Sequence, residues 1–423
     1  MGTAARTHRL PVVALTALGL LAGGALATPA AIAAPATAEQ QRAARAGTEA
    51  PLTVTSSTVP AATTPQRMSN DIVWDPVWTL NRPAAWTLTL KDTVGRAFRT
   101  FTGTGSDIRP QWDGRVDDSW KDAPNGVFTW TLTGTADGAA PVELGTGKVA
   151  HTGGRAVRHD YGSRGGAPDG TGDIITTTAS GTMRFAFGHA GTGNFSGSHT
   201  TTGWPKGILP VSIGARQNGG SCNDLLVRMP DGELRRYSSN CRLSKTPDFK
   251  PGDHHLSLGK RWNTHDVITS PGDLTRDGRA DVVAREAKTG TLYLFATYRN
   301  GSGYLRKKVV LGTGFKGYKK IIGAGDLNGD RNGDLLLQDA SNELWLMPGT
   351  GKGTLGPRTL VVRDWGASYN SVVGVGDLTG DGHADLVARD TAGRIWRHNG
   401  TGKGTFGTRV QLGTGWQVYD RLT

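Results

Sequence analysis

The chain has 423 residues, of which 62 are glycine, and a formal net charge of +12 at pH 7. This length exceeds one ordinary hydrophobic core and predicts two or three domains. Because lysine and arginine are scattered along the chain, the charge favours a generally basic surface over a nucleic-acid site. Attraction to an anionic cell envelope stays open.

The N-terminus has the pattern of a secretory signal peptide. Basic residues precede an apolar run that ends near Ala27, and small residues follow it. We therefore expect residues 1–33 to be a signal, with cleavage after Ala33 or Ala38. No later stretch is apolar enough to span a bilayer, so the sequence predicts a secreted, extracellular protein without a membrane span.

A linker and a β-domain are expected next. Residues 34–68 are rich in Ala, Thr and Pro, which predicts a disordered linker. In residues 69–152 large apolar side chains alternate with threonines, as at 86–90 and 128–132, and turn-forming pairs such as Asp113-Gly114 separate the runs. This alternation predicts an antiparallel β-sandwich.

The same region resembles a known family. The segments that carry the resemblance are Asn81-Arg82-Pro83-Ala84-Ala85-Trp86, Trp112-Asp113-Gly114-Arg115 and Ala123-Pro124-Asn125-Gly126-Val127-Phe128. They are similar to the immunoglobulin-like domain of flagellar hook-capping proteins, with Phe128 where tyrosine is usual. The resemblance implies an Ig-like spacer without a catalytic role.

Residues 157–423 repeat a unit of about 50 residues. Aspartates that precede an apolar strand recur at intervals of 51 to 57 residues, at Asp173, Asp224, Asp281, Asp334 and Asp385. Aromatic residues recur in step, at Trp204, Trp262, Phe315, Trp365 and Trp416. Four short strands in each unit predict one blade of a β-propeller. We therefore expect an all-β protein in which five blades follow the sandwich.

The ring of blades must also close. Residues 413–422 match the segment that opens a blade at residue 312, so the chain stops just after it begins a strand. The first blade begins late, near Asp160, and lacks such a strand. We therefore expect the C-terminal strand to complete the first blade.

Three acidic loops, here called loops 1 to 3, begin at Asp273, Asp326 and Asp377. Side-chain oxygens at positions 1, 3, 5 and 9, with the carbonyl of position 7, form the donor set that wraps Ca²⁺. The expected ligands are Asp273, Thr275, Asp277, the Arg279 carbonyl and Asp281 in loop 1; Asp326, Asn328, Asp330, the Asn332 carbonyl and Asp334 in loop 2; and Asp377, Thr379, Asp381, the His383 carbonyl and Asp385 in loop 3. Position 12 lies in an apolar strand, which excludes EF-hands.

These loops and the strands after them resemble FG-GAP/VCBS-type repeats. Such repeats are the calcium-binding blades of integrin-like propellers and of many secreted actinobacterial proteins. The resemblance covers residues 157–423 and implies about three bound Ca²⁺ ions. In loop 2, Arg331 stands where glycine is usual, which puts the turn geometry of that loop in question.

The two upstream repeats have lost the loop chemistry. Counting back from Asp173 gives Asp169, Ala167 and Gly165, and counting back from Asp224 gives Gly220, Asn218 and Arg216. Neither repeat is expected to bind metal well. Cys222 and Cys241 are the chain's two cysteines, and in an oxidising compartment we expect them to pair, with two free thiols as the alternative. Such a disulfide would stabilise the fold by roughly 3 kcal/mol.

No catalytic motif stands out in the sequence. The Gly-Thr-Gly-Lys-Gly-Thr runs at 349–354 and 400–405 read as hairpin turns, because neither is followed by Lys-Ser/Thr or a helix. His254, His255 and His265 fit a surface loop better than a zinc site. The alternative of a glycosidase-like hydrolase with paired carboxylates near the central channel stays open.

A non-catalytic binding or adhesion module fits the sequence better. A spacer followed by a propeller presents a rigid surface, and Tyr293, Trp345 and Trp396 could stack on sugars, although aromatics on blade strands also serve as core. We expect an extracellular glycan or a cell-wall polymer as the ligand. Nucleic acid is not expected as a partner, and the protein is expected to be a monomer.

Overall fold

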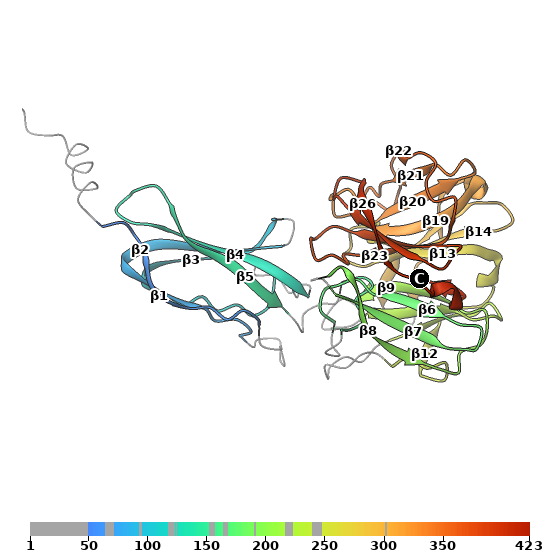
Figure 1. The fold of residues 1–423 in the computed structure, drawn as a ribbon, viewed down its shortest axis with the longest axis horizontal. Coiled ribbons are helices and arrows are strands. Elements are labelled where there is room, and N and C mark those ends of the chain that lie inside the picture. Colours follow the sequence, from blue (N-terminus) through green and yellow to red (C-terminus); the bar gives the residue numbers. More distant parts are fainter. Residues whose placement is uncertain are drawn as a thin grey trace, which may run out of the picture. The chain divides into compact units, whose positions relative to one another are not determined.

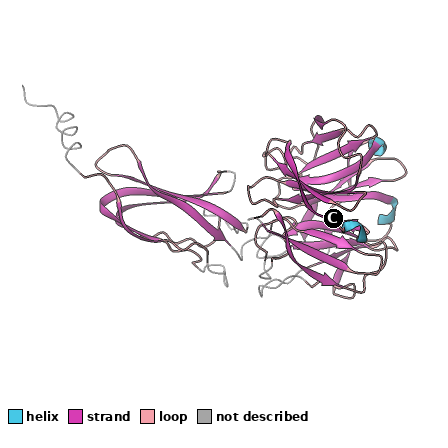
Figure 2. Cartoon of the chain, viewed as in Figure 1, coloured by secondary structure: helices cyan, strands magenta, loops and turns pink. Residues whose placement is uncertain are grey.

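The computed structural model describes residues 50–63, 72–92, 95–116, 123, 125–151, 157–163, 168–189, 192–215, 223–238, 248–300 and 303–423. In these ranges the chain is built from strands, and its helical elements are three short 3-10 turns, η1 (Trp262–Thr264), η2 (Phe315–Gly317) and η3 (Trp416–Val418) (Figure 2). None of the helices described could cross a membrane. The expected all-β fold class is confirmed.

The first five strands form one antiparallel sheet. They are β1 (Val54–Thr58), β2 (Val77–Lys91), β3 (Ala97–Ile108), β4 (Gly126–Thr135) and β5 (Val142–His151). The sheet has the order β1-β2-β4-β5, with β3 paired to β2. Trp74, Trp78 and Trp112 are each at most 2% exposed and form the centre of its core. The alternation of large residues and threonines thus gives β2 and β4 one packed face each.

Strand β1 lies inside the 34–68 range that the composition assigned to a disordered linker. It pairs with β2 through Val54–Leu80 and Thr58–Val77, so this part of the prediction was wrong. Backbone pairing at a sheet edge does not need large apolar side chains, and β1 is mostly exposed. The signal segment and the rest of the linker before residue 50 lie outside the described residues.

Residues 157–423 form five four-stranded antiparallel sheets, as the repeat count predicted (Figure 1). In strand order they are β27 (Arg421–Leu422), β6 (Ile174–Thr177), β7 (Met183–His189) and β8 (Asn194–Thr201) in blade 1; β9 (Leu209–Ala215), β10 (Asn223–Arg228), β11 (Leu234–Tyr237) and β12 (His255–Ser257) in blade 2; β13 (His265–Gly272), β14 (Asp281–Glu286), β15 (Leu292–Phe295) and β18 (Val309–Gly312) in blade 3; β19 (Tyr318–Gly325), β20 (Asp334–Asp339), β21 (Leu344–Met347) and β22 (Thr359–Val362) in blade 4; and β23 (Tyr369–Gly376), β24 (Asp385–Asp390), β25 (Ile395–Gly400) and β26 (Phe406–Gly413) in blade 5. Blade 3 carries an additional hairpin, β16 (Thr297–Asn300) and β17 (Gly303–Leu305).

The C-terminal strand closes the ring, as expected. Figure 1 shows the red end of the chain beside the green strand β6, and Leu422 pairs with Thr176. Two backbone hydrogen bonds between Thr423 and Ile175, of 2.8 and 2.9 Å, extend the pairing. Residues 157–159 then continue this inner strand, because the Asp173 amide donates to the His159 carbonyl at 2.8 Å. Blade 1 is therefore built from both ends of the propeller segment.

Packing between neighbouring blades explains the apolar runs after each loop. The second strands β10, β14, β20 and β24 are buried over nearly their whole length. Side chains of adjacent blades share cores; Leu226 of blade 2 and Val282 of blade 3, for example, belong to one cluster. A strand packed on both faces has no solvent-facing positions, so its sequence does not alternate. Each fully buried Leu or Val contributes roughly 1.5–3 kcal/mol.

Candidate functional site

Loops 1 to 3 connect the first and second strands of blades 3, 4 and 5, and they share one backbone conformation. The residues at positions 4 and 6 of every loop have positive φ, between 61° and 86°. Glycine occupies four of these six places, and Arg276 and Arg331 occupy the other two. Arg331 therefore adopts the turn that glycine takes elsewhere, and the geometry of loop 2 is kept.

The aspartate at position 9 holds each loop together through its side chain. In loop 3, Asp385 Oδ2 accepts hydrogen bonds from the amides of Leu378 and Thr379 at 2.9 and 3.1 Å. Its Oδ1 accepts the amide of Gly400, at the end of the third strand, at 2.8 Å. Asp281 and Asp334 accept the amides of Leu274 and Leu327 through Oδ2 and those of Thr297 and Gly349 through Oδ1, and all three aspartates are fully buried.

The aspartate at position 1 lies at the mouth of each loop and accepts the amide of position 6. These bonds are 2.6 Å from Gly278 to Asp273, 2.9 Å from Arg331 to Asp326 and 2.7 Å from Gly382 to Asp377. At position 5, Oδ1 of each aspartate accepts the amide of position 7, at 2.8 to 3.1 Å. Several carboxylates are thus gathered within each nine-residue loop.

Burial and mutual repulsion oppose the ionisation of these carboxyl groups. Burial, with a smaller contribution from the neighbouring loop carboxylates, raises the pKa of Asp281 to about 6 and the pKa values of Asp334 and Asp385 to about 7. The pKa values of Asp326 and Asp377 are raised by burial and by the position 5 carboxylate. A divalent cation would relieve this repulsion, so the donor set fits Ca²⁺.

The oxygen-bearing side chains of loops 1 to 3 do not converge on a common point. Within the described part of the chain, no group of three or more His, Cys, Asp or Glu side chains is arranged to hold a metal. The position 9 carboxylates are directed at backbone amides and serve the fold first. The ligand sets of loops 1 to 3 therefore stay predictions.

Each loop lies at a junction between blades. The Gly333 amide of loop 2 donates to the Asp273 carbonyl of loop 1 at 2.9 Å, and the Gly353 amide donates to the Leu274 carbonyl at 2.8 Å. The Gly404 amide makes the same contact with Leu327 at 2.7 Å. The two Gly-Thr-Gly-Lys-Gly-Thr runs are therefore hairpin turns that pack on the preceding loop, and a cation held there would stabilise two blades at once.

Blade 1 has a loop of the same kind that fixed-offset counting misaligned. Asp173 Oδ2 accepts the amides of Tyr161 and Gly162 at 2.6 and 3.1 Å, as a position 9 aspartate does. Position 1 is therefore Asp160, whose carboxylate accepts the amides of Asp169 and Gly170 at 3.1 and 2.7 Å. An insertion between Gly162 and Asp169 displaced the count; two of the residues it had selected, Gly165 and Ala167, lie outside the described residues.

In blade 2 the position 9 aspartate forms a buried ion pair. Asp224 Oδ2 accepts Nε and Nη2 of Arg236 at 2.9 and 2.6 Å, and both side chains are buried. The guanidinium lies 4.4 Å from the ring centroid of Tyr304, in the additional hairpin of blade 3. Cys222 and Cys241 lie outside the described residues, so their disulfide stays a prediction.

Three cation–aromatic pairs occupy corresponding places on blades 3, 4 and 5. Each joins a half-buried ring on the third strand to an exposed cation from the fourth strand or just before it. The pairs are Tyr293 with Lys308 at 3.8 Å, Trp345 with Arg358 at 4.1 Å and Trp396 with Arg409 at 4.4 Å, measured to the ring centroid. Sequence analysis singled out the rings but missed the cations, whose spacing of about 51 residues could have revealed them.

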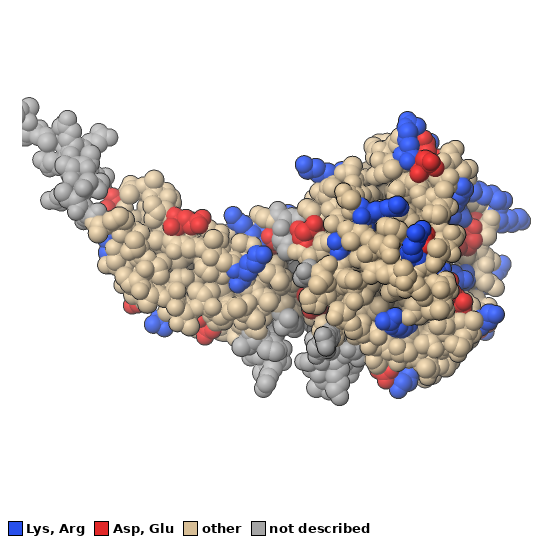
Figure 3. Space-filling model, in the orientation of Figure 1, with Lys and Arg blue, Asp and Glu red and all other residues tan. Residues whose placement is uncertain are grey.

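Hydrogen bonds fix the position of two of these rings. Trp345 Nε1 donates to Asp339 at 2.9 Å, and Trp396 Nε1 donates to Asp390 at 3.1 Å. Arg409 also donates to the Tyr369 hydroxyl at 2.8 Å. Over the face drawn in Figure 3, lysines and arginines are scattered, and several lie beside Asp or Glu.

The histidines singled out by the sequence have separate surroundings. His255 Nδ1 lies 2.9 Å from the Asp253 carbonyl and its ring packs on Tyr237, whereas His254 is exposed. His265 is buried against Trp262 and Phe295. These contacts place His255 and His265 in two different packing environments.

The family match lies in blades 3 to 5. Residues 273–337 and 326–388 match the family described as FG-GAP-like repeat. No curated protein matches the sequence. The similar solved structures include a lectin of Agrocybe aegerita that recognises non-reducing terminal N-acetylglucosamine, at 19% identity over 62% of this chain and 80% of that chain, with a TM-score of 0.35.

Two further structures are similar at lower identity. They are Sqt1 of Saccharomyces cerevisiae, at 11% over 84% of this chain and 87% of that chain with a TM-score of 0.29, and a DUF4784 family protein of Bacteroides caccae, at 10% over 86% and 84% with a TM-score of 0.20. TM-scores this low support no conclusion about the present chain.

Proposed function

The chain carries FG-GAP-like repeats, and from this premise we propose that it is a secreted, calcium-dependent, non-catalytic binding module for anionic glycans of a cell envelope. Calcium would be held by loops 1 to 3 and would stabilise the junctions between blades. The ligand would lie on the outer strands of blades 3 to 5.

The observation that carries the proposal is the repetition of the cation–aromatic pairs. Each cation lies over the face of its ring, which holds the cation in place, and this exposed cation can pair with a carboxylate or phosphate of the glycan. Because the same pair recurs on three consecutive blades, a polymer with a repeating charge could contact several pairs together. Weak contacts then add up through multivalency.

The donor set of the loops supports the calcium part of the proposal. Oxygen ligands at positions 1, 3, 5 and 9 suit a hard cation, and burial together with the neighbouring carboxylates raises the pKa values of Asp277, Asp326 and Asp377. Calcium would act through the fold, because loops 1 and 2 lie under the hairpin of the following blade. Removing calcium should therefore weaken glycan binding indirectly.

The test compares two triple variants of the full chain. Changing Lys308, Arg358 and Arg409 to alanine removes the paired cations, whereas changing Lys206, Lys352 and Lys403 to alanine removes three exposed cations elsewhere with the same change of net charge. Binding to an acidic polysaccharide is measured against a neutral one. We expect at least a tenfold loss for the first variant and less than a twofold loss for the second.

Equal losses for the two variants would show that only net charge matters and would overturn the proposed site. Turnover of a polysaccharide that survives in Asp277→Ala, Asp330→Ala and Asp381→Ala would instead favour a hydrolase. Binding that disappears with a chelator and returns with calcium supports the calcium part of the proposal.

A further inference from the structure

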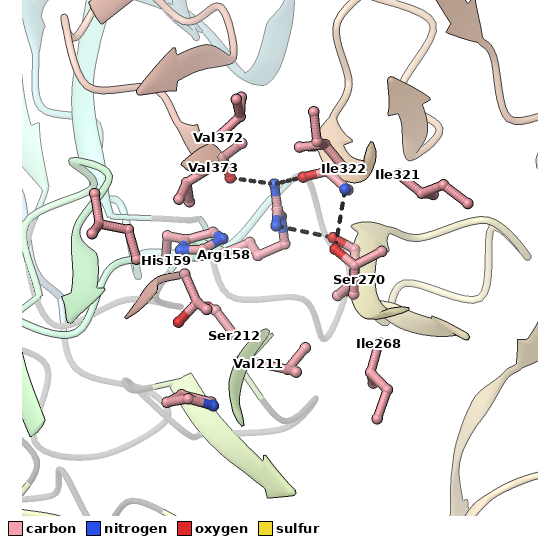
Figure 4. A pocket seen from close by; sticks show the side chains of 16 residues that line it. Arg158, His159, Val211, Ser212, Ile268, Ser270, Ile321, Ile322, Val372 and Val373 are labelled. Carbon is pink, nitrogen blue, oxygen red and sulfur yellow. Dashed lines mark hydrogen bonds between the residues drawn. The ribbon is translucent and has the colours of Figure 1, made fainter. Parts of the chain in front are cut away.

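The first strands of the five blades surround a cavity of about 150 Å³ on the propeller axis. Its lining comes from β9, β13, β19, β23 and β27, together with the segment that precedes loop position 1 of blade 1. At roughly 30 Å³ for each water, this space matches about five waters or one small organic molecule. Figure 4 shows the labelled side chains around it.

Arg158 provides the charge of this cavity. Its Nη1 donates to the Ser270 carbonyl at 3.0 Å and its Nη2 to the Gly374 carbonyl at 3.0 Å, with a longer contact of 3.5 Å to Gly323 (Figure 4). A guanidinium has five N–H donors, so these contacts leave donors over. Burial lowers the pKa of Arg158 to about 10, which leaves the group charged at neutral pH.

His159 stands where the other blades have glycine. By strand register its place corresponds to Gly214, Gly272, Gly325 and Gly376, which all have positive φ. His159 has a φ of 69°, a conformation that costs a residue with a side chain about 1 kcal/mol or more. Glycine at this place would satisfy the backbone without strain, so the histidine side chain is not required by the fold. Strained residues of this kind concentrate at functional sites.

Several polar side chains in the lining have unused hydrogen-bonding atoms, among them Ser212, Thr423, His159 and Ser270. His159 is 4% exposed and Ser270 is 2% exposed. Among the described residues, neither the His159 Nδ1 atom nor the Ser270 Oγ atom has a hydrogen-bond partner. Buried polar atoms are normally paired, so these two indicate a further molecule in the cavity.

The remainder of the lining defines the chemistry of that molecule. Among the residues that the structure describes, no Asp or Glu side chain lines the cavity, and its walls include Val211, Ile268, Ile322 and Val373. A cation and the hydroxyls of Ser212, Ser270 and Thr423 lie beside these aliphatic walls, an arrangement that suits a carboxylate joined to a short apolar group. We propose that the axial cavity of the propeller binds a small aliphatic carboxylic acid, whose carboxylate is held by Arg158, His159 and Ser270.

The experiment is a thermal titration of the full chain with sodium propionate, against sodium chloride at equal ionic strength. We expect the melting temperature to rise with the logarithm of propionate concentration, because a ligand of the native state stabilises it by mass action. His159→Gly should keep the fold, since glycine occupies this place in the other blades. It should abolish the shift, and Ser270→Ala should weaken propionate binding at least tenfold.

Arg276→Gly is the matched control. It also replaces a residue of positive φ by glycine but lies in loop 1, and its propionate shift should equal that of the wild type. Absence of a shift in the wild type, or an unchanged shift in both cavity variants, would overturn the proposal. A larger shift with sodium sulfate than with propionate would overturn the carboxylic-acid assignment, because an inorganic oxyanion would then be the better occupant.

Discussion

Blades 3 to 5 differ from blades 1 and 2 in the loop that contains the position 9 aspartate. Blades 3 to 5 carry a nine-residue acidic loop with one conformation. Blade 1 keeps the first and last aspartates, Asp160 and Asp173, across a longer loop, and blade 2 turns its position 9 aspartate toward Arg236. The position 9 aspartate is common to all five, which indicates that it serves the propeller itself, whereas the carboxylates at positions 1 and 5 of loops 1 to 3 are additions for which we propose calcium as the ligand.

The largest expected effect comes from removing a position 9 aspartate. Asp385→Ala would leave the amides of Leu378, Thr379 and Gly400 without their acceptor. At about 1–3 kcal/mol for each unpaired buried group, the metal-free protein should lose about 4 kcal/mol or more of unfolding free energy. Urea denaturation in EDTA measures the loss.

Asp381→Ala is the control for that change. Its side chain is exposed at position 5, so the metal-free protein should lose less than about 0.5 kcal/mol. Equal losses for the two variants would mean that position 9 has no special structural role.

The ion pair of blade 2 gives the next largest effect. Asp224→Ala leaves the Arg236 guanidinium buried without its counter-charge, which should cost about 3–5 kcal/mol. The double variant Asp224→Leu with Arg236→Met removes both charges and should recover most of that loss. If the double variant is as unstable as Asp224→Ala, burial of an unpaired charge is not the cause.

Close approach of the inner strands predicts a smaller loss in blade 5. A Cβ added at Gly374 would lie 2.2 Å from the Gly323 carbonyl oxygen, so Gly374→Ala should destabilise the protein by about 1–3 kcal/mol. Gly317→Ala is matched to it, because a Cβ there meets no atom within 4 Å. Thermal unfolding of the two variants should therefore differ, and identical curves would contradict the close approach.

The smallest effect concerns the strain in loop 2. Arg331 has a φ of 71° at a place where loops 1 and 3 have glycine. Arg331→Gly should stabilise the metal-free protein by about 1 kcal/mol through relief of the left-handed conformation. A loss of stability would show that the Arg331 side chain stabilises the protein by more than the strain of its backbone conformation costs.

The sequence was sufficient for the repeating parts of the molecule. Five blades, their acidic loops and closure by the C-terminal strand follow from intervals of 51 to 57 residues and from apolar second strands. Non-repeating parts were missed. Counting residues back from Asp173 at a fixed offset does not allow for the insertion before Asp169, so Asp160 was not identified as position 1 of blade 1. Strand β1 was missed because its pairing with β2 does not require an apolar sequence pattern.

The cavity on the propeller axis also could not be predicted from the sequence. Arg158 and His159 are adjacent in the chain, but their partner carbonyls lie 112 to 216 residues away from Arg158. Only the closed ring brings these groups together. Position-specific strain at His159 likewise becomes visible only when its φ is compared with that of the corresponding glycines.

Calcium titration of the EDTA-stripped full chain by calorimetry, with the melting temperature followed in parallel, tests the central claim most directly. We expect saturable heat with about one ion for each of loops 1 to 3, and a melting temperature that rises with calcium. Both responses should be lost when Asp277, Asp330 and Asp381 are all changed to alanine. Absence of heat in the wild type, together with a melting temperature that EDTA leaves unchanged, would contradict the account.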